Sequence, residues 1–129
     1  MRVERYDAER HLEIIQGWHN RRGVAPYPWE CLPKFGLVVY DDARPMACVF
    51  IRSCEGQVAM MDHVLANDEL PPGGARDAID LIFDHAEQIV GTEMGAKLFI
   101  TWSSRDSMLR RSRERGFALI PTTVIVGRL

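Results

Sequence analysis

Residues 65–83 read "LANDELPPGGARDAIDLIF" and contain the most informative junction of the sequence. A strand ends in its first residues, a loop rich in proline and glycine follows, and apolar residues then recur at helical spacing. We expect the loop at residues 67–74 and a helix over residues 75–90. Such a junction is either a plain turn or a place where free backbone N–H groups at the helix start bind a phosphate.

Upstream of this junction, three apolar runs are separated by two short polar turns. They cover residues 35–41, 45–54 and 58–66. Apolar runs joined by tight turns predict antiparallel strands that follow one another in a meander.

The N-terminal part predicts a strand followed by a helix. Residues 1–6 alternate as an edge strand does, Asp7 is a good N-cap, and Gly23 ends the helix. The prolines of residues 24–36 predict a loop or a broken helix, and this segment also contains Tyr27 and Trp29. Together with Trp18 and Trp102, these aromatic residues are candidates for a substrate pocket, although aromatic side chains more often belong to a core.

The C-terminal part predicts a strand, a short helix and a closing strand. Residues 96–102 form the strand, and residues 103–116 form a helix capped by Ser103 or Ser104. Residues 117–129 predict one or two strands broken at Pro121.

These elements predict a single domain, residues 1–129, of the α/β class, with α and β segments around a mixed sheet. The antiparallel meander is followed by a strand–helix–strand unit, which requires a parallel crossover. We therefore expect helices on both faces of the sheet.

Composition narrows the classes of function. The net charge of −2 gives no global attraction to nucleic acid or to a membrane, and no apolar run is long enough to span one. Three cysteines without metal-ligand spacing predict free thiols and no metal site, and free thiols favour a cytoplasmic protein. Because the N-terminus is charged from the second residue, we expect no signal peptide there. The five arginines of residues 105–115 predict a solvated helix face.

The order of elements, with a glycine loop before a helix and a terminal helix ending in "RERGF", resembles the GNAT superfamily of acyl-CoA N-acyltransferases. The family's diphosphate loop reads Gln/Arg-x-x-Gly-x-Gly/Ala, and "LPPGGA" keeps its glycines but has Leu70 at the first position. The family's last helix commonly ends Tyr-x-x-x-Gly-Phe. Here Gly116 and Phe117 are kept, and Ser112 replaces the tyrosine.

The resemblance implies that acetyl-CoA is the co-substrate and an amine, on a small molecule or a protein, is the acceptor. The diphosphate would bind at Gly73, Gly74, Ala75 and Arg76. The backbone of Val64, Leu65 and Ala66 would contact the pantetheine arm and the reacting carbonyl.

The resemblance also suggests catalytic residues. Asp62 and His63 lie on the fourth strand, where the family often has its base, and alternation predicts that they point to opposite faces. His63 is the better base because its ordinary pKa lies near neutrality. Ser112 stands where the family has its acid, but a serine is shorter and less acidic than a tyrosine.

A second hypothesis remains open. The changed polar positions, the paired prolines and the short C-terminus favour a degenerate GNAT-fold protein, for instance a viral, phage or virion accessory protein that acts as a protein-interaction module. An open sheet edge would also allow a partner chain or a homodimer.

Overall fold

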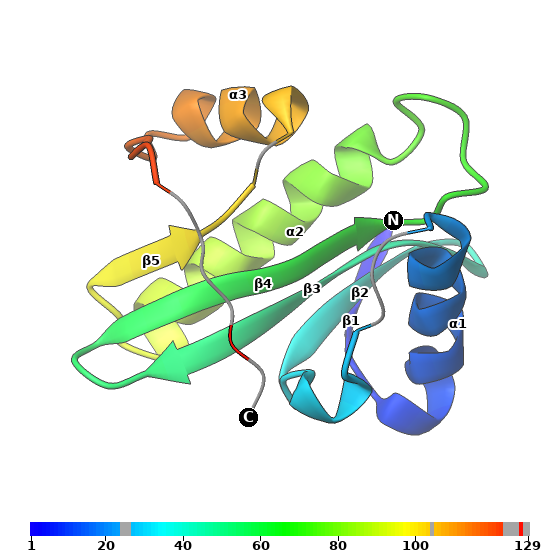
Figure 1. Ribbon diagram of the computed structural model, residues 1–129, viewed down its shortest axis with the longest axis horizontal. Helices are drawn as coiled ribbons and strands as arrows, with labels where there is room; N and C mark the ends of the chain where they lie inside the picture. The colour runs from blue at the N-terminus through cyan, green and yellow to red at the C-terminus, as the bar shows by residue number, and fades with distance from the viewer. Residues whose placement is uncertain (24–26, 104, 123–126, 128–129) are drawn as a thin grey trace.

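The computed structural model describes residues 1–23, 27–103, 105–122 and 127. Five strands form one mixed sheet in the order β1-β2-β3-β4-β5 (Figure 1). The first three pairings are antiparallel, and β4 pairs with β5 in parallel. The strands are β1 (Arg2–Arg5), β2 (Gly36–Asp41), β3 (Arg44–Cys54), β4 (Val58–Ala66) and β5 (Leu98–Thr101).

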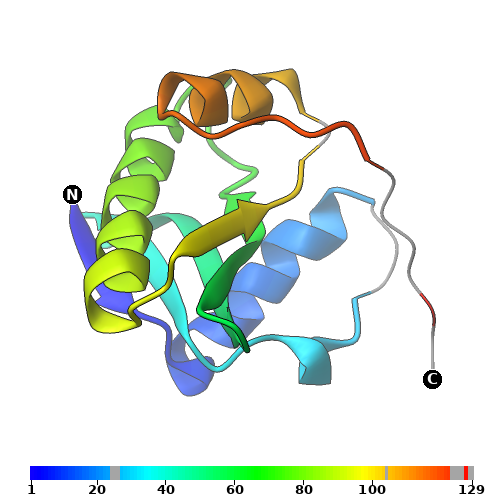
Figure 2. The same ribbon diagram turned by 90° about the vertical axis from the view of Figure 1, so that its left-hand side faces the viewer.

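Helices cover both faces of the sheet, as predicted (Figure 2). On one face lies α1 (Ala8–Arg21), and Asp7 caps it by accepting the Glu9 N–H at 2.9 Å. On the other face lies α2 (Arg76–Gln88), which continues as the π-helical turn η2 (Ile89–Glu93). A short 3-10 helix, η1 (Trp29–Cys31), precedes β2. The last helix is α3 (Asp106–Glu114).

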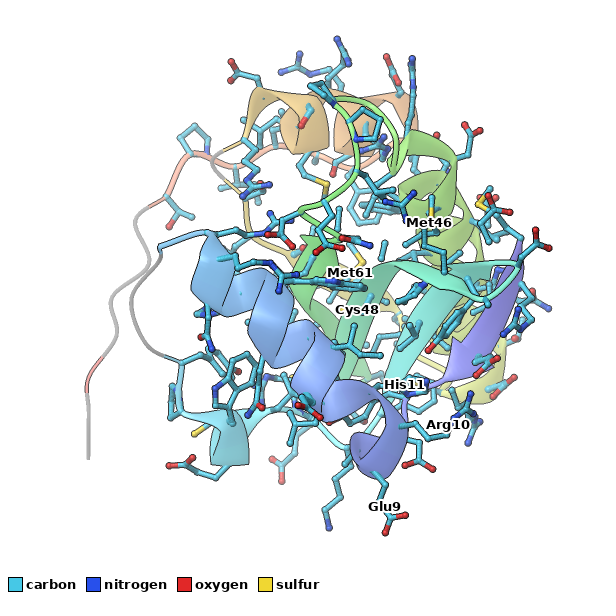
Figure 3. The ribbon with its side chains drawn as sticks, turned by 90° about the vertical axis from the view of Figure 1, so that its right-hand side faces the viewer. Glu9, Arg10, His11, Met46, Cys48 and Met61 are labelled. Carbon is cyan, nitrogen blue, oxygen red and sulfur yellow. The ribbon has the colours of Figure 1, made fainter. Side chains whose placement is uncertain are left out.

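Alternation along the strands divides the core into two layers. Val39 and Val49 face α2 and pack with Ile79, Ile82 and Phe83. Their neighbours Val38 and Cys48 face α1 and pack with Ile15, Trp18 and Phe50. Figure 3 shows α1 lying across this second face. Full burial of Ile82 or Phe83 contributes roughly 1.5–3 kcal/mol each.

The strand β4 separates from β5 halfway along its length. Only the first four residues of β4, as far as Met61, are paired with β5. Beyond that point β4 continues to Ala66 with β3 as its one strand partner in the described chain. The two strands therefore splay apart and leave a gap in the sheet.

A bulge in β4 begins at the same place. The register with β3 shifts after Asp62, so that His63 and Val64 together oppose the single residue Val49. His63 has φ 51°, a left-handed conformation that is uncommon for a residue other than glycine. The bulge interrupts the alternation of side chains. The prediction that Asp62 and His63 point to opposite faces is therefore wrong, since both lie on the side of α1.

Ion pairs attach α3 to α2. Arg111 Nε lies 2.6 Å from Asp80 Oδ1, and Arg115 Nε lies 2.7 Å from Glu87 Oε1. Arg115 also pairs with Asp84. Two of the five arginines expected on a solvated face are thus structural contacts between helices.

Two predictions at the C-terminal end need correction. Arg105, rather than Ser103, is the N-cap of α3, and the Ser103 hydroxyl instead accepts the Arg105 N–H at 3.1 Å. Ser104 is outside the described residues. The closing strand is absent over residues 117–122, where Pro121 lacks a backbone donor, and the rest of that prediction falls on residues 123–126 and 128–129, which are not described.

Gly36 on β2 lies against Phe50 of β3, and a substitution there tests how tightly the two strands pack. A Cβ at this position would lie 2.7 Å from the Phe50 ring and 2.8 Å from the Val49 carbonyl oxygen. We expect Gly36→Ala to lower the free energy of unfolding by about 1–3 kcal/mol, because the strand backbone must shift.

The matched control is Gly91→Ala, where a Cβ meets no atom within 4 Å. Urea unfolding of both variants measures the difference. Equal midpoints for the two variants would show that β2 and β3 adapt freely to the added methyl group.

Candidate functional site

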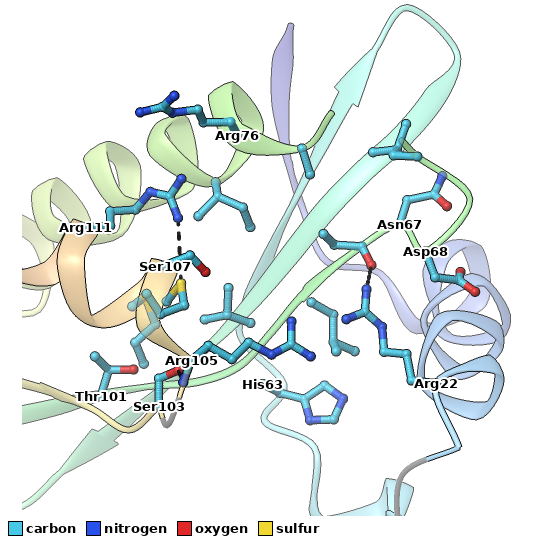
Figure 4. Close-up of a pocket in the computed structure, with 18 of the residues that line it drawn as sticks. Arg22, His63, Asn67, Asp68, Arg76, Thr101, Ser103, Arg105, Ser107 and Arg111 are labelled. Carbon is cyan, nitrogen blue, oxygen red and sulfur yellow. Dashed lines mark hydrogen bonds between the residues drawn. The ribbon is translucent and has the colours of Figure 1, made fainter. Parts of the chain in front are cut away.

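A cavity of about 820 Å³ occupies the gap between β4 and β5 (Figure 4). Its walls come from the free half of β4, the loop before α2, the start of α3 and the last turn of α1. Residues from three separate stretches of the chain, 19–22, 61–79 and 101–111, therefore meet here because β4 and β5 diverge.

Most of the residues predicted to form the site line this cavity. They are Asp62, His63, Val64, Leu65, Ala66, Gly73, Ala75 and Arg76. Gly74 and Ser112 are not among the lining residues. Ser112 is only 5% exposed and lies on the buried side of α3.

The glycine loop has two different requirements. Gly73 has φ 79°, which favours glycine, and its backbone turns the chain into α2. Gly74 is close-packed, since a Cβ there would lie 3.0 Å from the Pro71 carbonyl oxygen, which accepts the Gly74 N–H. Among the described residues, no acceptor is bonded to the N–H groups of Gly73 and Ala75. The junction is thus a tight turn that also leaves amides free at the helix start.

The cavity is rich in arginine. Arg111 is paired with Asp80, but four other lining arginines have no carboxylate within 4.0 Å in the described chain: Arg22, Arg76, Arg105 and Arg110. The two lining acids near them are already paired, Asp62 with Arg52 and Asp68 with Arg21. Although the protein is acidic overall, the cavity therefore favours an anionic ligand.

His63 lies in an aromatic cluster. Its ring stacks on His19 with centroids 5.4 Å apart, and Tyr27 and Trp29 lie at 4.6 and 5.8 Å. The Nε2 atom is buried and has no hydrogen-bond partner in the described chain. Burial lowers the pKa of His63 to about 4; Asp62 opposes this shift, and His19 and Arg52 add to it. The imidazole is thus neutral near pH 7, and its buried Nε2 has no partner in the described chain.

Asp62 is occupied by a structural contact. Its Oδ2 accepts a hydrogen bond from Arg52 Nε at 2.9 Å, and the same guanidinium donates to the Cys31 carbonyl at 2.8 Å. This pair connects β3 and β4 to η1. A proton-accepting role for Asp62 would require the pair to break.

The aromatic residues proposed for a pocket take different positions. Trp102 lines the cavity and is 46% exposed. The rings of Tyr27 and Trp29 contact the ring of His63. Trp18 is buried in the core between α1 and the sheet.

Arg22 was missed at the sequence level. It is the C-cap residue of α1, and its Nη2 donates to the Ala66 carbonyl at the end of β4 (Figure 4). Arg105 and the hydroxyl residues Ser103 and Ser107 were also missed as cavity residues. The arginine-rich stretch of residues 105–115 was the available signal for Arg105, whereas the sequence around Arg22 has none.

The described residues contain no group of three or more His, Cys, Asp and Glu side chains that could hold a metal ion. None of the helices in this part of the chain is both long enough and apolar enough to cross a membrane. Cys31, Cys48 and Cys54 are free thiols, as expected.

The lowered pKa of His63 makes the stability of the fold depend on pH. Because the folded pKa of about 4 lies below the ordinary value of 6.5, the unfolded chain binds the proton more tightly between these values. This contribution to stability is complete above pH 6.5 and is lost as pH falls towards 4. We expect His63→Asn to remove this dependence of stability on pH. Asparagine is chosen because it tolerates the left-handed backbone.

Urea unfolding between pH 4 and 7 measures this effect, with His85→Asn on α2 as the control. The wild type should lose stability relative to His63→Asn as the pH falls. Parallel curves for the two proteins would contradict the burial of a neutral imidazole at this position.

Comparisons with known proteins identify the fold. No family model and no curated protein sequence matches the chain. Solved structures do match over nearly the full length of both chains.

A probable acetyltransferase from meticillin-resistant Staphylococcus aureus has a TM-score of 0.70 at 12% identity, covering 98% of this chain and 100% of that chain. A transcriptional regulator from Bacillus halodurans C-125 has a TM-score of 0.64 at 11% identity, covering 98% and 99%. An aminoglycoside N-acetyltransferase in complex with CoA has a TM-score of 0.59 at 14% identity, covering 99% of each chain. At such identities the likeness concerns the fold, and the sequence prediction of that fold is confirmed: the chain has the fold of the GNAT acyl-CoA N-acyltransferases.

Proposed function

We propose that the protein transfers an acetyl group from acetyl-CoA to an amine. The observation that carries this proposal is the cavity between β4 and β5, which combines free amides, unpaired arginines and a neutral histidine. The CoA complex of the aminoglycoside N-acetyltransferase with the same fold supports the choice of co-substrate.

The start of α2 provides the site for the diphosphate. The free N–H groups of Gly73 and Ala75 and the positive end of the helix dipole favour phosphate oxygens. Arg76 and Arg110 line the cavity without a carboxylate partner within 4.0 Å in the described chain, and each adds a charge-assisted contact. Pro71 and Pro72 supply no donors, so the amides after them carry the binding.

The free half of β4 provides the site for the pantetheine arm. Val64, Leu65 and Ala66 line the gap that β5 leaves open, and their backbone groups take the place of a strand partner for the amides of the arm. The thioester then lies where the strands part, next to the bulge at His63.

The reaction there forms a bond between the amine nitrogen and the thioester carbonyl carbon and breaks the C–S bond. The proton that the amine loses passes to His63 Nε2 directly or through water, and coenzyme A leaves as a thiolate that takes up a proton to become a thiol. His63 is the proposed base because it is neutral and its Nε2 has no other partner in the described chain. Asp62 holds Arg52 beside the ring.

The protonation of the leaving thiolate is assigned to solvent or to a hydroxyl within the cavity. Ser112, which the family resemblance suggested, lies outside the lining. Ser107 on α3 and Thr101 at the end of β5 do line it. A thiol is acidic enough for departure without strong acid assistance.

Two observations favour the second candidate function, a protein-interaction module without transferase activity. Arg22 occupies the Ala66 carbonyl, so a pantetheine arm that used this carbonyl would compete with a side chain of the protein. The described part of the chain also exposes apolar side chains at and beyond β5, namely Leu98, Trp102 and Ile120. A partner protein or a second copy would cover them.

Thermal unfolding with acetyl-CoA separates the two functions. Ligand at about 100 times its dissociation constant adds roughly 2.7 kcal/mol to stability, which is a shift of several degrees. We expect Arg76→Gln to weaken binding about tenfold or more, because it removes a charge-assisted contact.

The matched control is Arg113→Gln, an equal change of charge at an exposed position of α3 outside the cavity lining. It should bind acetyl-CoA like the wild type. If acetyl-CoA leaves the melting temperature of the wild type unchanged, the transferase proposal fails and the interaction module takes its place.

Kinetics of His63→Asn test the base. We expect kcat to fall about 100-fold, the low end for general-base catalysis, because the low pKa makes His63 a weak base. The KM for acetyl-CoA should not change. In the wild type, His63 is neutral above about pH 5 given its pKa of about 4, so the pH dependence above that value should follow the ionisation of the amine.

Stopped assays on an amine panel, with His85→Asn as the control, measure these rates. A His63→Asn protein with the wild-type kcat would remove this residue from the mechanism and leave a water molecule as the base.

A further inference from the structure

Two arginines face each other across the cavity. Arg22 comes from the C-terminal end of α1, and Arg105 comes from the N-cap of α3. Figure 4 shows their side chains extending toward one another from opposite walls, on the side of the cavity where His63 lies. They are distinct from Arg76 and Arg111, which the same figure shows on the far side, next to α2.

This arrangement is unfavourable without an anion. Neither guanidinium has a carboxylate within 4.0 Å among the described residues. Arg22 Nε is buried and has no hydrogen-bond partner in that part of the chain. Burial lowers the pKa of Arg22, and the charge of Arg105 lowers it further, although a guanidinium stays protonated at neutral pH. A buried donor without an acceptor and two like charges both weaken the empty cavity.

The nearest acid does not neutralise the pair. Asp68 interacts with Arg22 at longer range, but both of its carboxylate oxygens accept hydrogen bonds from Arg21, each at 2.8 Å. The pair therefore has donors for an anion from outside the protein. A guanidinium is a planar fork that matches the two oxygens of a carboxylate.

We propose that Arg22 and Arg105 bind a carboxylate carried by the acceptor, so that the acceptors are amino acids or other amines with a carboxylate. The inference rests on the proposed acetyl transfer. Its basis is location: the pair flanks His63, where the amine must lose its proton, whereas the phosphates of coenzyme A have the amides of Gly73 and Ala75 together with Arg76. Arg22 and Arg105 thereby determine specificity by orienting the amine towards the thioester.

Matched substrates test the proposal. Amino acids whose carboxylate lies at increasing distance from the amine are each compared with the corresponding carboxamide, at saturating acetyl-CoA. For at least one pair, we expect the wild type to favour the acid by about 10- to 100-fold in kcat/KM, the range for charge-assisted hydrogen bonds. Arg105→Gln and Arg22→Gln should abolish this preference by raising the KM for the acid. The KM values for the amide and for acetyl-CoA should stay unchanged.

The control is Arg113→Gln, which changes the same charge on α3 outside the cavity and should keep the preference. Because Arg22 also holds the end of β4, Arg22→Gln is interpreted only if its melting curve is cooperative. The exposed Arg105 carries the test by itself if that variant unfolds.

Three kinetic results would each overturn the proposal. The wild type uses amides as well as acids, or the preference survives in Arg105→Gln, or Arg105→Gln raises the KM for acetyl-CoA instead, which would assign the pair to the phosphates of the coenzyme. Calorimetry with the amino acids, on free protein and on protein saturated with CoA, measures binding without turnover. Binding of the acid that depends on Arg105 supports the proposal even where no product forms. If the acid binds neither the free nor the CoA-saturated protein, the proposal fails. The two outcomes therefore separate failure of the arginine pair from failure of acetyl transfer.

Discussion

The strands β4 and β5 diverge after Met61, and the contacts and charges of the cavity are arranged around this divergence. Past Met61, the backbone of β4 has no strand on the β5 side among the described residues, yet nearly all buried backbone groups in proteins have a partner. The protein supplies one from a side chain, since Arg22 donates to Ala66. Asn67 then ends the strand, because its side-chain Nδ2 donates to the Pro45 carbonyl and its side-chain Oδ1 accepts the Glu69 N–H. What remains unfilled along this edge is the cavity.

The charges of the protein are sorted around this gap. Acids on α2 face α3 and bind its arginines, while Asp62 and Asp68 are paired with arginines of β3 and α1. This leaves a basic cavity in a protein whose net charge is −2. Local pairing, rather than overall composition, therefore decides which ligands the site attracts, and the net charge alone says little about it.

The sequence predicted those parts of the fold that depend on local patterns. Alternating apolar runs, two tight turns and a glycine loop before an amphipathic helix specify the meander and the crossover to β5, and both are present. The loop residues Gly73, Ala75 and Arg76 line the cavity because they lie at the start of a helix, which the local pattern also indicates. Their part in phosphate binding stays a prediction. The order of elements also carried the family resemblance that the solved structures bear out at the level of fold.

The features that were missed depend on tertiary contacts. The bulge at His63 could not be predicted, because bulges are usually recognised by a glycine and there is none here. The left-handed backbone is accompanied instead by packing of the His63 ring against Tyr27 and His19. Arg22 reaches Ala66 across 44 residues of sequence. The assignment of Ser112 came from a motif, whereas the position of α3 on α2 buries this side chain away from the cavity.

The attachment of α3 has a consequence for how the two walls of the gap respond to their surroundings. The β4 wall is fixed by main-chain hydrogen bonds to β3, which dissolved salt hardly affects. The α3 wall is joined to α2 in part through Arg111 and Arg115, whose acidic partners are 38–62% exposed. Mobile ions screen such pairs over a Debye length of about 8 Å at physiological ionic strength. Dissolved salt therefore weakens the ion pairs of the α3 wall and leaves the hydrogen bonds of the β4 wall nearly unchanged.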